Sequence, residues 1–406
     1  MDKKVASWCL YDFANSSYSA VIAAVIFPVY YTNVIVGNEY GQGDLWWGKA
    51  IALSMAVVAL TSPFLGGIAD FAKIRKRLLF FYTVVCAISV ASFSFLEKDM
   101  VISGFVLIVL ANIGLEGGIV FYNSFLTRIA APSHRGRVSA WGFGIGYAGS
   151  IIALFIALLL INKGMITYVW PMVAAFFLCF SLPAFIFLPQ DERTGIRFHN
   201  AAVTGFMQTF GRLKLMIRNK QQRRFLAAYL LYEDGVCTVI VFSSIFAATT
   251  LGFKADELIL MYILVQLTAL SGSFLLARRI DKWGPKKVII LSLLLWVTVS
   301  ISAYFVHGKI FFLMIACLAG FGLGSLQAAT RAFYAKFIVQ GQESGYFGVY
   351  SLVGKSSAIL GPLVFGYMSS TFGSQRPAIL AVALFFIAGL LLLQSVKVQD
   401  SYVYNR

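Results

Sequence analysis

The sequence predicts an all-α membrane protein with twelve transmembrane helices in two six-helix halves. Hydrophobic residues make up 59% of the 406 residues and charged residues only 12%, about half the charged fraction of a soluble domain. Apolar runs long enough for a helix to cross a hydrocarbon core of roughly 30 Å recur along the chain. One long polar stretch follows the sixth run, so we expect an N-terminal half at residues 1–188, a basic cytoplasmic linker at 189–224 and a C-terminal half at 225–406.

The predicted spans follow one another with short polar loops between them. Each run contains the roughly 20 apolar residues that a membrane-crossing helix needs. The runs of the first half are residues 8–36, 47–69, 78–96, 101–127, 138–161 and 167–188, and those of the second half are 225–251, 257–277, 288–307, 309–330, 345–370 and 374–396.

Basic residues are unevenly divided between the two sides of the membrane. The 33 Lys and Arg exceed the 17 Asp and Glu, which gives a formal net charge of +16. In a soluble protein this surplus would suggest a nucleic-acid partner. Here 26 of the 33 fall on one side if the N-terminus is cytoplasmic, and an excess of Lys and Arg marks cytoplasmic loops. We therefore predict cytoplasmic termini, a lipid bilayer as the surroundings and no nucleic acid as a partner.

The sequence contains no recognisable catalytic or cofactor motif. Its five cysteines lie one per apolar stretch without CxxC spacing and without a paired histidine, so we expect neither a metal site nor a disulfide framework. Walker, HExxH and GxSxG motifs are absent from the sequence. We therefore expect no metal, no cofactor and no enzymatic activity.

A short motif of acidic and basic residues follows the second span and returns after the eighth. Each copy places an Asp just past one span and a basic cluster at the start of the next, where the Asp can cap a helix N-terminus and pair with cations. Ordinary topogenic charge would explain one copy more readily than two. We predict that these hairpins control the conformation of the cytoplasmic side through Asp70, Arg75, Lys76, Arg77, Asp281, Gly284, Lys286 and Lys287.

A second repeat relates residues 123–150 to residues 331–358, each a span end, a polar hairpin and a glycine-rich span. The acidic hairpins resemble the G-x-x-x-D-x-x-G-x-[RK]-[RK] signature of the major facilitator superfamily, although the first copy has Lys73 where the second has Gly284. The resemblance implies parallel six-span halves related by an axis along the membrane normal, with the substrate site near the midplane between them.

The chain resembles one branch of that superfamily more closely. Trp8 to Ser16 in span 1, Val120 to Leu126 in span 4 and Tyr232 to Val236 in span 7 are similar to motifs in bacterial relatives of the vacuolar amino-acid effluxers of autophagy. Further similar segments are Gln327 to Arg331, Tyr346 to Gly348 and Gly354 to Pro362. The resemblance implies a monomeric secondary transporter of the bacterial plasma (inner) membrane, and small neutral amino acids are the best-known cargo of the eukaryotic members.

Polar side chains gather in spans 1, 4, 7 and 10, which line the cavity in the resembling superfamily. A charge inside a span costs about 2.5 to 3.5 kcal/mol on insertion scales, so each is a functional candidate. At about 1.5 Å per helical residue, Lys355 in span 11 falls near the midplane. The candidates for substrate binding or coupling are Asp12, Asn15, Ser16, Asn112, Glu116, Tyr122, Asn123, Glu233, Asp234, Gln327, Arg331 and Lys355.

The midplane charges have two interpretations each. Glu116 could be a proton carrier, or half of a structural ion pair with Lys355 or Arg331. Lys355 is the natural partner for a substrate carboxylate, or it forms a salt bridge with Glu233 or Asp234.

Residues nearer the cytoplasmic end also have alternatives. Tyr11 and Asp12 could form a gate with a basic residue of the other half, or lie at the membrane interface by snorkelling. Neutral side chains such as Asn15 and Gln327 could bind a zwitterion, or could equally bond neighbouring helices.

The sequence therefore predicts an efflux permease that works by alternating access, with residues 1–188 rocking against residues 225–396. We expect a small-molecule substrate, most simply a neutral amino acid or a similar metabolite, exported with proton coupling. Export of a lipid-like or drug-like amphiphile is the alternative if the cavity is wide, aromatic and open to lipid. A non-transporting membrane receptor or scaffold would leave the midplane charges unexplained.

Overall fold

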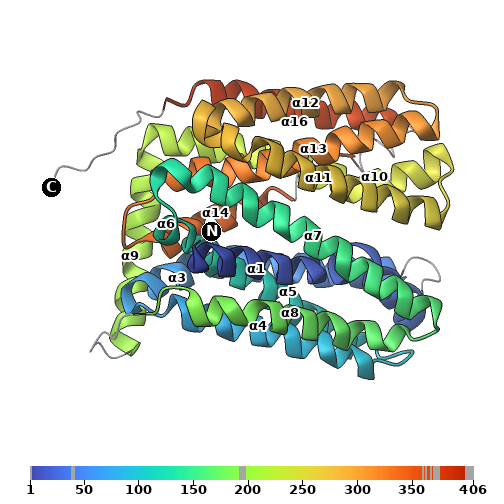
Figure 1. The fold of residues 1–406 in the computed structure, drawn as a ribbon, viewed down its shortest axis with the longest axis horizontal. Coiled ribbons are helices and arrows are strands. Elements are labelled where there is room, and N and C mark those ends of the chain that lie inside the picture. Colours follow the sequence, from blue (N-terminus) through green and yellow to red (C-terminus); the bar gives the residue numbers. More distant parts are fainter. Residues whose placement is uncertain are drawn as a thin grey trace.

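The computed structural model describes residues 2–37, 42–191, 198–358, 361, 364–365, 368 and 375–397. All regular elements in these ranges are helices, and most run along the long axis of the molecule (Figure 1). Helices of the first half, blue to green, form one bundle, and helices of the second half, yellow to red, form another beside it. The predicted all-α fold with two helical halves is confirmed.

The N-terminal half packs around a continuous apolar cluster that includes the fully buried side chains of Trp8, Tyr18 and Trp170. In this half α1 packs on α7 and α8, and α4 packs on α5 and α8. Its main helices are α1 (Lys3–Ser17), α3 (Gln42–Ala72), α4 (Arg75–Ser92), α5 (Val101–Ser124), α7 (Arg135–Asn162) and α8 (Val169–Phe187). Short helical segments join them: α6 (Leu126–Ile129), η4 (Phe93–Phe95), η5 (Pro132–His134) and η6 (Ile166–Tyr168).

The first predicted span bends in its middle. After α1 the chain continues as a π-helix, η1 (Tyr18–Val25), and then as α2 (Phe27–Tyr30) and η2 (Tyr31–Val36). The two parts meet at 42°, and Pro28 in the first turn of α2 cannot donate the N–H bond that would continue the helix. π-helical turns often occur at functional sites, and this one lies directly after the polar residues of α1.

The C-terminal half has its own apolar cluster, with Trp296, Phe225 and Tyr334 buried in it. α11 packs on α13, α10 packs on α16, and α12 contacts both α13 and α16. The helices are α10 (Lys220–Leu251), α11 (Ala255–Trp283), α12 (Pro285–Phe305), α13 (Lys309–Tyr334), η7 (Ala335–Phe337), α14 (Glu343–Ser356) and α16 (Gln375–Gln394).

The helices are long and apolar enough to cross a membrane at the predicted places. Ten helical segments meet that test within the described residues, and the bent segment from Lys3 to Val36 would be an eleventh. The predicted span at 345–370 begins with α14, and part of it lies outside the described residues. Large apolar side chains such as Ile102 and Leu384 are more than 60% exposed on the outside, where lipid would cover them.

The predicted linker contains a helix of its own, α9 (Phe198–Arg218). α9 lies across one end of the bundle, at the left in Figure 1. It packs on α3 so closely that a Cβ on Gly205 would stand 2.8 Å from the Cα of Ile68. The side chains of Arg193 and Arg197, also in the linker, lie outside the described residues.

The two acidic hairpins turn tightly. α3 ends at Ala72 and α4 begins at Arg75, while only Gly284 separates α11 from α12. Lys73 adopts a φ of 53° and Gly284 a φ of 84°. The first hairpin therefore forms its turn with a lysine in a backbone conformation that residues other than glycine rarely adopt.

Candidate functional site

Asp70, near the C-terminal end of α3, caps a helix of the other half. Its carboxylate accepts hydrogen bonds from the backbone N–H groups of Ser344 (3.0 Å) and Gly345 (2.8 Å) in the first turn of α14. Negative charge at a helix N-terminus is stabilised by the unpaired N–H groups there. The two helices can approach this closely because Gly66 lies against the backbone of Ser344, where a Cβ would collide with the carbonyl oxygen.

Arg75, the first residue of α4, completes this contact. Its guanidinium lies 2.8 Å from the carboxylate of Asp70 and 2.5 Å from that of Glu343, with all three side chains no more than 6% exposed. Glu343 also accepts the N–H of Gly341 at 3.0 Å. Buried charges need such pairing to be tolerated. Asp70, Arg75 and Glu343, which we call the buried triad, therefore join the two halves at this end.

The second copy of the hairpin makes the equivalent contact in the opposite direction. Asp281, near the end of α11, accepts the backbone N–H of Arg137 at 3.1 and 3.2 Å in the first turn of α7. Its carboxylate lies 3.7 Å from the Arg137 guanidinium. Arg137 and Gly345 occupy matching places in the second sequence repeat. Each acidic hairpin thus caps a second-repeat helix of the other half.

The two copies differ in the charges around the cap. Lys286 stands where the first copy has Arg75, and it donates to the carbonyl oxygens of Gln394 and Val396. Arg135 stands where α14 has Glu343, and it donates to the carbonyl oxygen of Ala335 at 3.1 Å. Two cations therefore occupy the positions that hold an ion pair in the buried triad.

Other basic residues of the hairpins contact their own half or solvent. The backbone N–H groups of Lys76 and Arg77 donate to Asp191, at 3.0 and 3.3 Å, just after α8. Burial raises the pKa of the Asp191 carboxyl, although these N–H groups act in the opposite direction. Lys287 is exposed. These contacts tie α4 to the end of α8 and do not cross between the halves.

Arg331 of α13 reaches into the N-terminal half. Its Nε donates to the hydroxyl of Ser139 (2.9 Å), and its terminal nitrogens donate to the Ser139 carbonyl (2.7 Å) and the side-chain oxygen of Asn123 (3.2 Å). The carboxylate of Asp12 lies 3.7 Å away. The structure thus brings together three of the candidates, and all of these partners belong to the opposite half.

Aromatic rings enclose the same guanidinium. The centroids of Phe143, Trp8 and Tyr122 lie 4.0, 4.6 and 5.8 Å from its central carbon. The rings of Trp8 and Tyr122 stack at 4.5 Å, and the indole N–H of Trp8 donates to the Tyr122 carbonyl at 2.9 Å. A planar guanidinium suits both the forked hydrogen bonds and the ring faces. The N-terminal half therefore forms a socket around Arg331.

Glu116 of α5 and Lys355 of α14 form an ion pair deeper in the molecule. Their charged atoms are 2.7 Å apart, and the side chains are 15% and 27% exposed, much more than those of the buried triad. Lys355 also interacts electrostatically with Glu233 of α10. Asp234 instead accepts the N–H of Gly361 at 2.8 Å. Of the pairings that the sequence left open, the structure contains the one between Glu116 and Lys355.

Three further candidates bond within the N-terminal half. Asn112 accepts a hydrogen bond from the hydroxyl of Tyr18 at 2.8 Å. The hydroxyl of Ser16 donates to the Asp12 carbonyl at 2.7 Å, and the Asn15 amide donates to the Asp12 carboxylate at 3.4 Å. Asn112 thus links α5 to η1, whereas the bonds of Ser16 and Asn15 lie within α1.

Gln327 takes part in a contact between the halves, because it accepts the hydroxyl hydrogen bond of Tyr147 at 2.8 Å. The contacts described between the halves begin at the hairpin end and continue inward as far as Glu116 and Lys355. The molecule is therefore closed at the end that carries the hairpins and α9.

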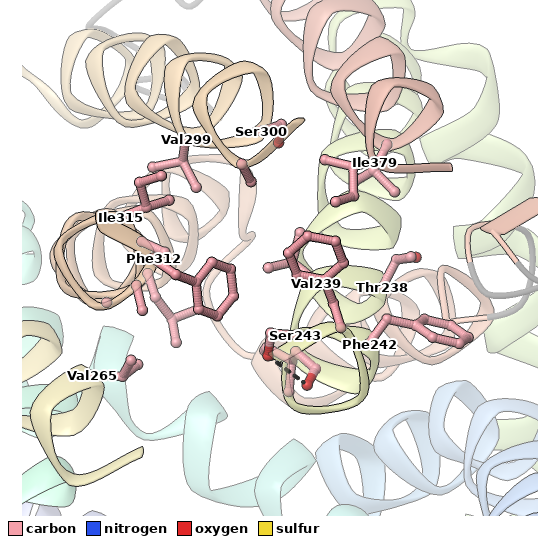
Figure 2. Close-up of a pocket in the computed structure, with 18 of the residues that line it drawn as sticks. Thr238, Val239, Phe242, Ser243, Val265, Val299, Ser300, Phe312, Ile315 and Ile379 are labelled. Atoms are coloured by element: carbon pink, nitrogen blue, oxygen red, sulfur yellow. Dashed lines mark hydrogen bonds between the residues drawn. The ribbon is translucent and has the colours of Figure 1, made fainter. Parts of the chain in front are cut away.

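An apolar cavity of about 140 Å³ lies inside the C-terminal half, among α10, α11, α12, α13 and α16. Figure 2 shows Phe312, Ile315 and Ile379 around it. The hydroxyls of Ser243 and Ser300 on its wall donate to carbonyl oxygens of their own helices. The walls therefore suit an apolar group.

Sequence reasoning did not single out several residues of these contacts. The second repeat contains Ser139, Glu343 and Arg135, but its two copies share the order and spacing of their parts more than the identity of their residues. A residue-by-residue comparison of its two copies would have pointed to the helix starts that meet Asp70 and Asp281. Tyr147 falls in the same repeat, at the place that corresponds to Lys355.

Solved structures place this fold in a known class. The human organic anion transporter MFSD10 (TETRAN) has a TM-score of 0.75 at 17% identity, covering 97% of this chain and 98% of that one. FucP, a Major Facilitator Superfamily transporter in the outward conformation, has a TM-score of 0.74 at 14% identity, covering 98% of this chain and 100% of that one. Together with the apolar spans, this similarity shows the fold of the major facilitator transporters in an integral multi-pass membrane protein.

Sequence comparison gives the family. Residues 49–404 match the model of the vacuole effluxer Atg22-like family, and the chain belongs to that family, as its motifs predicted. The uncharacterized MFS-type transporter YxiO of Bacillus subtilis (strain 168) is 27% identical over 411 residues, covering 98% of this chain and 96% of YxiO. Autophagy-related protein 22-1 of Aspergillus fumigatus is 27% identical over 64% of this chain. The match covers 48% of that relative, so this chain spans about half of its length.

Proposed function

We propose that this transporter moves a small zwitterionic metabolite, most simply a neutral amino acid, outward across the bacterial inner membrane with proton coupling. The observation that carries the proposal is the ion pair between Glu116 and Lys355, whose charged atoms lie 2.7 Å apart and come from opposite halves. The name of the family, vacuole effluxer, agrees with export.

The ion pair offers a simple way to couple substrate and proton. A substrate carboxylate that binds Lys355 competes with Glu116 for the same cation. Glu116, released from Lys355, then attracts the substrate ammonium together with Glu233, and a proton on Glu116 would remove this attraction. Substrate and proton therefore oppose each other at a single site, so protons that move inward can drive the substrate outward.

The surroundings of the pair suit an ammonium group and a neutral side chain. Glu233 lies within the electrostatic reach of Lys355 and supplies a carboxylate for the substrate ammonium. The hydrogen bond between Tyr147 and Gln327 offers donors and acceptors that can be exchanged with substrate. These roles place the site between the halves, as the sequence candidates in α5, α10 and α13 require.

Alternating access would follow from rocking of the two halves. The buried triad, the Asp281 contact and the Arg331 socket hold one end closed, and positive-inside topology assigns that end to the cytoplasm. The state described is then one that is closed toward the cytoplasm. A single chain supplies both halves, so a monomer is sufficient for transport.

A lipid-like or drug-like amphiphile is the second candidate substrate. The apolar cavity in the C-terminal half favours it, because Phe242, Phe246, Phe312 and Trp296 are among the residues on the wall. A substrate with a long apolar part could place that part there and its polar head at the ion pair.

Flux into proteoliposomes tests the proposal. We expect radiolabelled neutral amino acids to exchange across the membrane and to be driven by a pH gradient. Glu116→Gln should keep exchange but lose the response to the gradient, because the proton site is gone while Lys355 remains. Lys355→Met should lose both. Glu257→Gln, at an exposed ion pair with Lys309, is the matched control and should behave as the parent.

Two outcomes would contradict the proposal. Gradient-driven amino-acid flux that persists in Glu116→Gln would remove proton coupling through this residue. Transport of a fluorescent amphiphile but of no amino acid would replace the first substrate class with the second.

A further inference from the structure

A polar pocket of about 630 Å³ opens at the closed end. It is formed by both halves and by the start of the linker. Ile338, Gln340, Gly341 and Glu343 come from the C-terminal half, Asp70, Lys73, Arg75, Thr127, Arg128, Pro132 and Arg135 from the N-terminal half, and Asp191 from the linker. Its size is that of a pocket for a small ligand. Because both halves form its walls, the pocket exists only while this end is closed.

The acidic residues of the pocket already have partners. Asp70 accepts two backbone N–H groups of α14 and pairs with Arg75. Glu343 pairs with the same guanidinium. Asp191 accepts backbone N–H groups at the start of α4. The three carboxylates are therefore engaged in holding the protein together.

Two buried donor atoms of the arginines that line the pocket are not used. The Nη1 atom of Arg75 and the Nε atom of Arg135 are buried, and neither has a hydrogen-bond partner among the described residues. Among the described residues, the other hydrogen bonds of Arg135 go to the backbone carbonyls of Ala335 and Thr127. Arg128 is exposed at the rim. A buried donor without a partner costs about 1–3 kcal/mol, so a ligand that accepts these bonds would recover free energy.

We propose that this pocket binds a phosphate-type oxyanion, and that the bound anion holds the two halves together at this end. The guanidinium fork of arginine matches the oxygen geometry of phosphate, and the unused donors belong to arginines. The asymmetry between the two hairpins agrees with this role. Arg135 occupies the place that corresponds to Glu343 and so supplies a cation where the buried triad has an acid.

Such an anion would act as a brake on transport. A ligand that binds only one of two conformations stabilises that conformation by mass action, and at 100 times its Kd it shifts the equilibrium about 100-fold. Opening of this end would then require release of the anion. The anion could be free in solution or could be the headgroup of an anionic lipid, since both present the same oxygens.

Thermal unfolding of the purified full-length protein tests binding. Inorganic phosphate and pyrophosphate should raise Tm in a saturable manner relative to chloride at equal ionic strength. A parallel titration uses nanodiscs with phosphatidic acid in place of phosphatidylcholine. A saturable response to the soluble anions identifies a free ligand, and one seen only with phosphatidic acid identifies a lipid headgroup; both support the site.

Variants connect the response to the pocket. Arg135→Gln should weaken the apparent affinity about 10-fold or more, because it removes a charged donor. Arg128→Gln, at the exposed rim, should also weaken it and serves if Arg135→Gln does not fold. The matched control is Arg279→Gln, an exposed arginine of α11 that does not line the pocket, and it should leave the affinity unchanged.

Spin labels test the brake itself. With labels at Lys4→Cys and Lys282→Cys, which are exposed residues of opposite halves, the anion should narrow the distance distribution toward the short, closed state. Absence of any saturable response to phosphate, pyrophosphate and phosphatidic acid would overturn the proposal. An equal loss of affinity in Arg279→Gln, or a distance distribution that the bound anion widens, would overturn it as well.

Discussion

Replacing Asp70 by Asn is the most direct test of how the closed end is held. In the structure the Asp70 carboxylate accepts two backbone hydrogen bonds from α14 and pairs with Arg75 at 2.8 Å. Asparagine keeps one acceptor oxygen and the shape of the side chain, but it has no charge. The substitution therefore removes the ion pair and one charge-assisted bond, and it weakens the other.

The expected magnitude follows from the charges that remain. Hydrogen bonds to charged groups contribute about 1.5–3 kcal/mol and neutral ones about 0.5–1.5 kcal/mol. After the substitution Arg75 still pairs with Glu343 at 2.5 Å, so no buried charge is left without a partner. We expect the closed state to lose about 2 kcal/mol of stability relative to the open state, near the lower end of the range for charged groups. This loss shifts the equilibrium between the two states roughly 30-fold toward opening. Arg75→Gln should be worse, because it leaves two buried carboxylates without their cation.

Pulsed electron-spin measurements with labels at positions 4 and 282 would report this shift. The labels are introduced after Cys179, Cys237 and Cys317, which are not fully buried, have been replaced by serine. The parent should give one short distance, and Asp70→Asn should add a longer component that becomes larger still in Arg75→Gln.

Asp281→Asn is the matched comparison. Its ion pair with Arg137 is longer, 3.7 Å, and that arginine side chain is 30% exposed, so its effect should be smaller than that of Asp70→Asn. If Asp70→Asn keeps the single short distance of the parent, the helix caps do not decide the equilibrium between the closed and the open end, which would refute the reasoning. A larger long-distance component in Asp281→Asn than in Asp70→Asn would refute the expectation that the more deeply buried ion pair contributes more.

Two other substitutions probe contacts elsewhere. Arg331→Lys keeps the charge but loses the forked guanidinium that donates to Ser139 and Asn123. The free energy of unfolding in a denaturant titration should therefore fall by about 2 kcal/mol. An unchanged denaturation midpoint would contradict the assigned hydrogen bonds. Glu257→Gln should leave Tm at neutral pH nearly unchanged, because its pair with Lys309 is exposed. The hydrogen bond from Lys309 lowers the pKa of Glu257. Any small difference in Tm from the parent should therefore exist above the unfolded-state pKa of Glu257 and vanish as the pH falls below its folded-state pKa. A large difference in Tm, or one that grows in acid, would contradict this.

Much of the fold could be predicted because the membrane imposes a simple rule on the chain. Apolar runs of sufficient length predicted the spans, and the polar stretch between the sixth and seventh runs predicted where one half ends and the other begins. The helix α9 inside that stretch was not predicted. Its sequence is basic, and its fit to α3 depends on the contact of Gly205 with the backbone of Ile68, which a charge pattern does not reveal.

The site could be predicted by residue but not by partner. Charges within spans are costly enough to identify Asp12, Glu116, Arg331 and Lys355 as candidates. Which of them pair depends on how the halves are rotated against each other, and this is a property of the packed helices. The sequence therefore left two partners open for Glu116, and the structure contains the pair with Lys355 at 2.7 Å.

The crosswise capping by Asp70 and Asp281 has a consequence for how such a chain could arise. Each half offers an acid and a helix start, and each uses both against the other half, which is the pattern of an interface with two-fold symmetry. Two identical six-helix proteins could form both contacts at once as a dimer. Fusion of two such copies into one chain would preserve the interface from the first generation. The difference between Glu343 and Arg135 could arise only afterwards, because in a dimer of identical subunits every substitution appears on both sides.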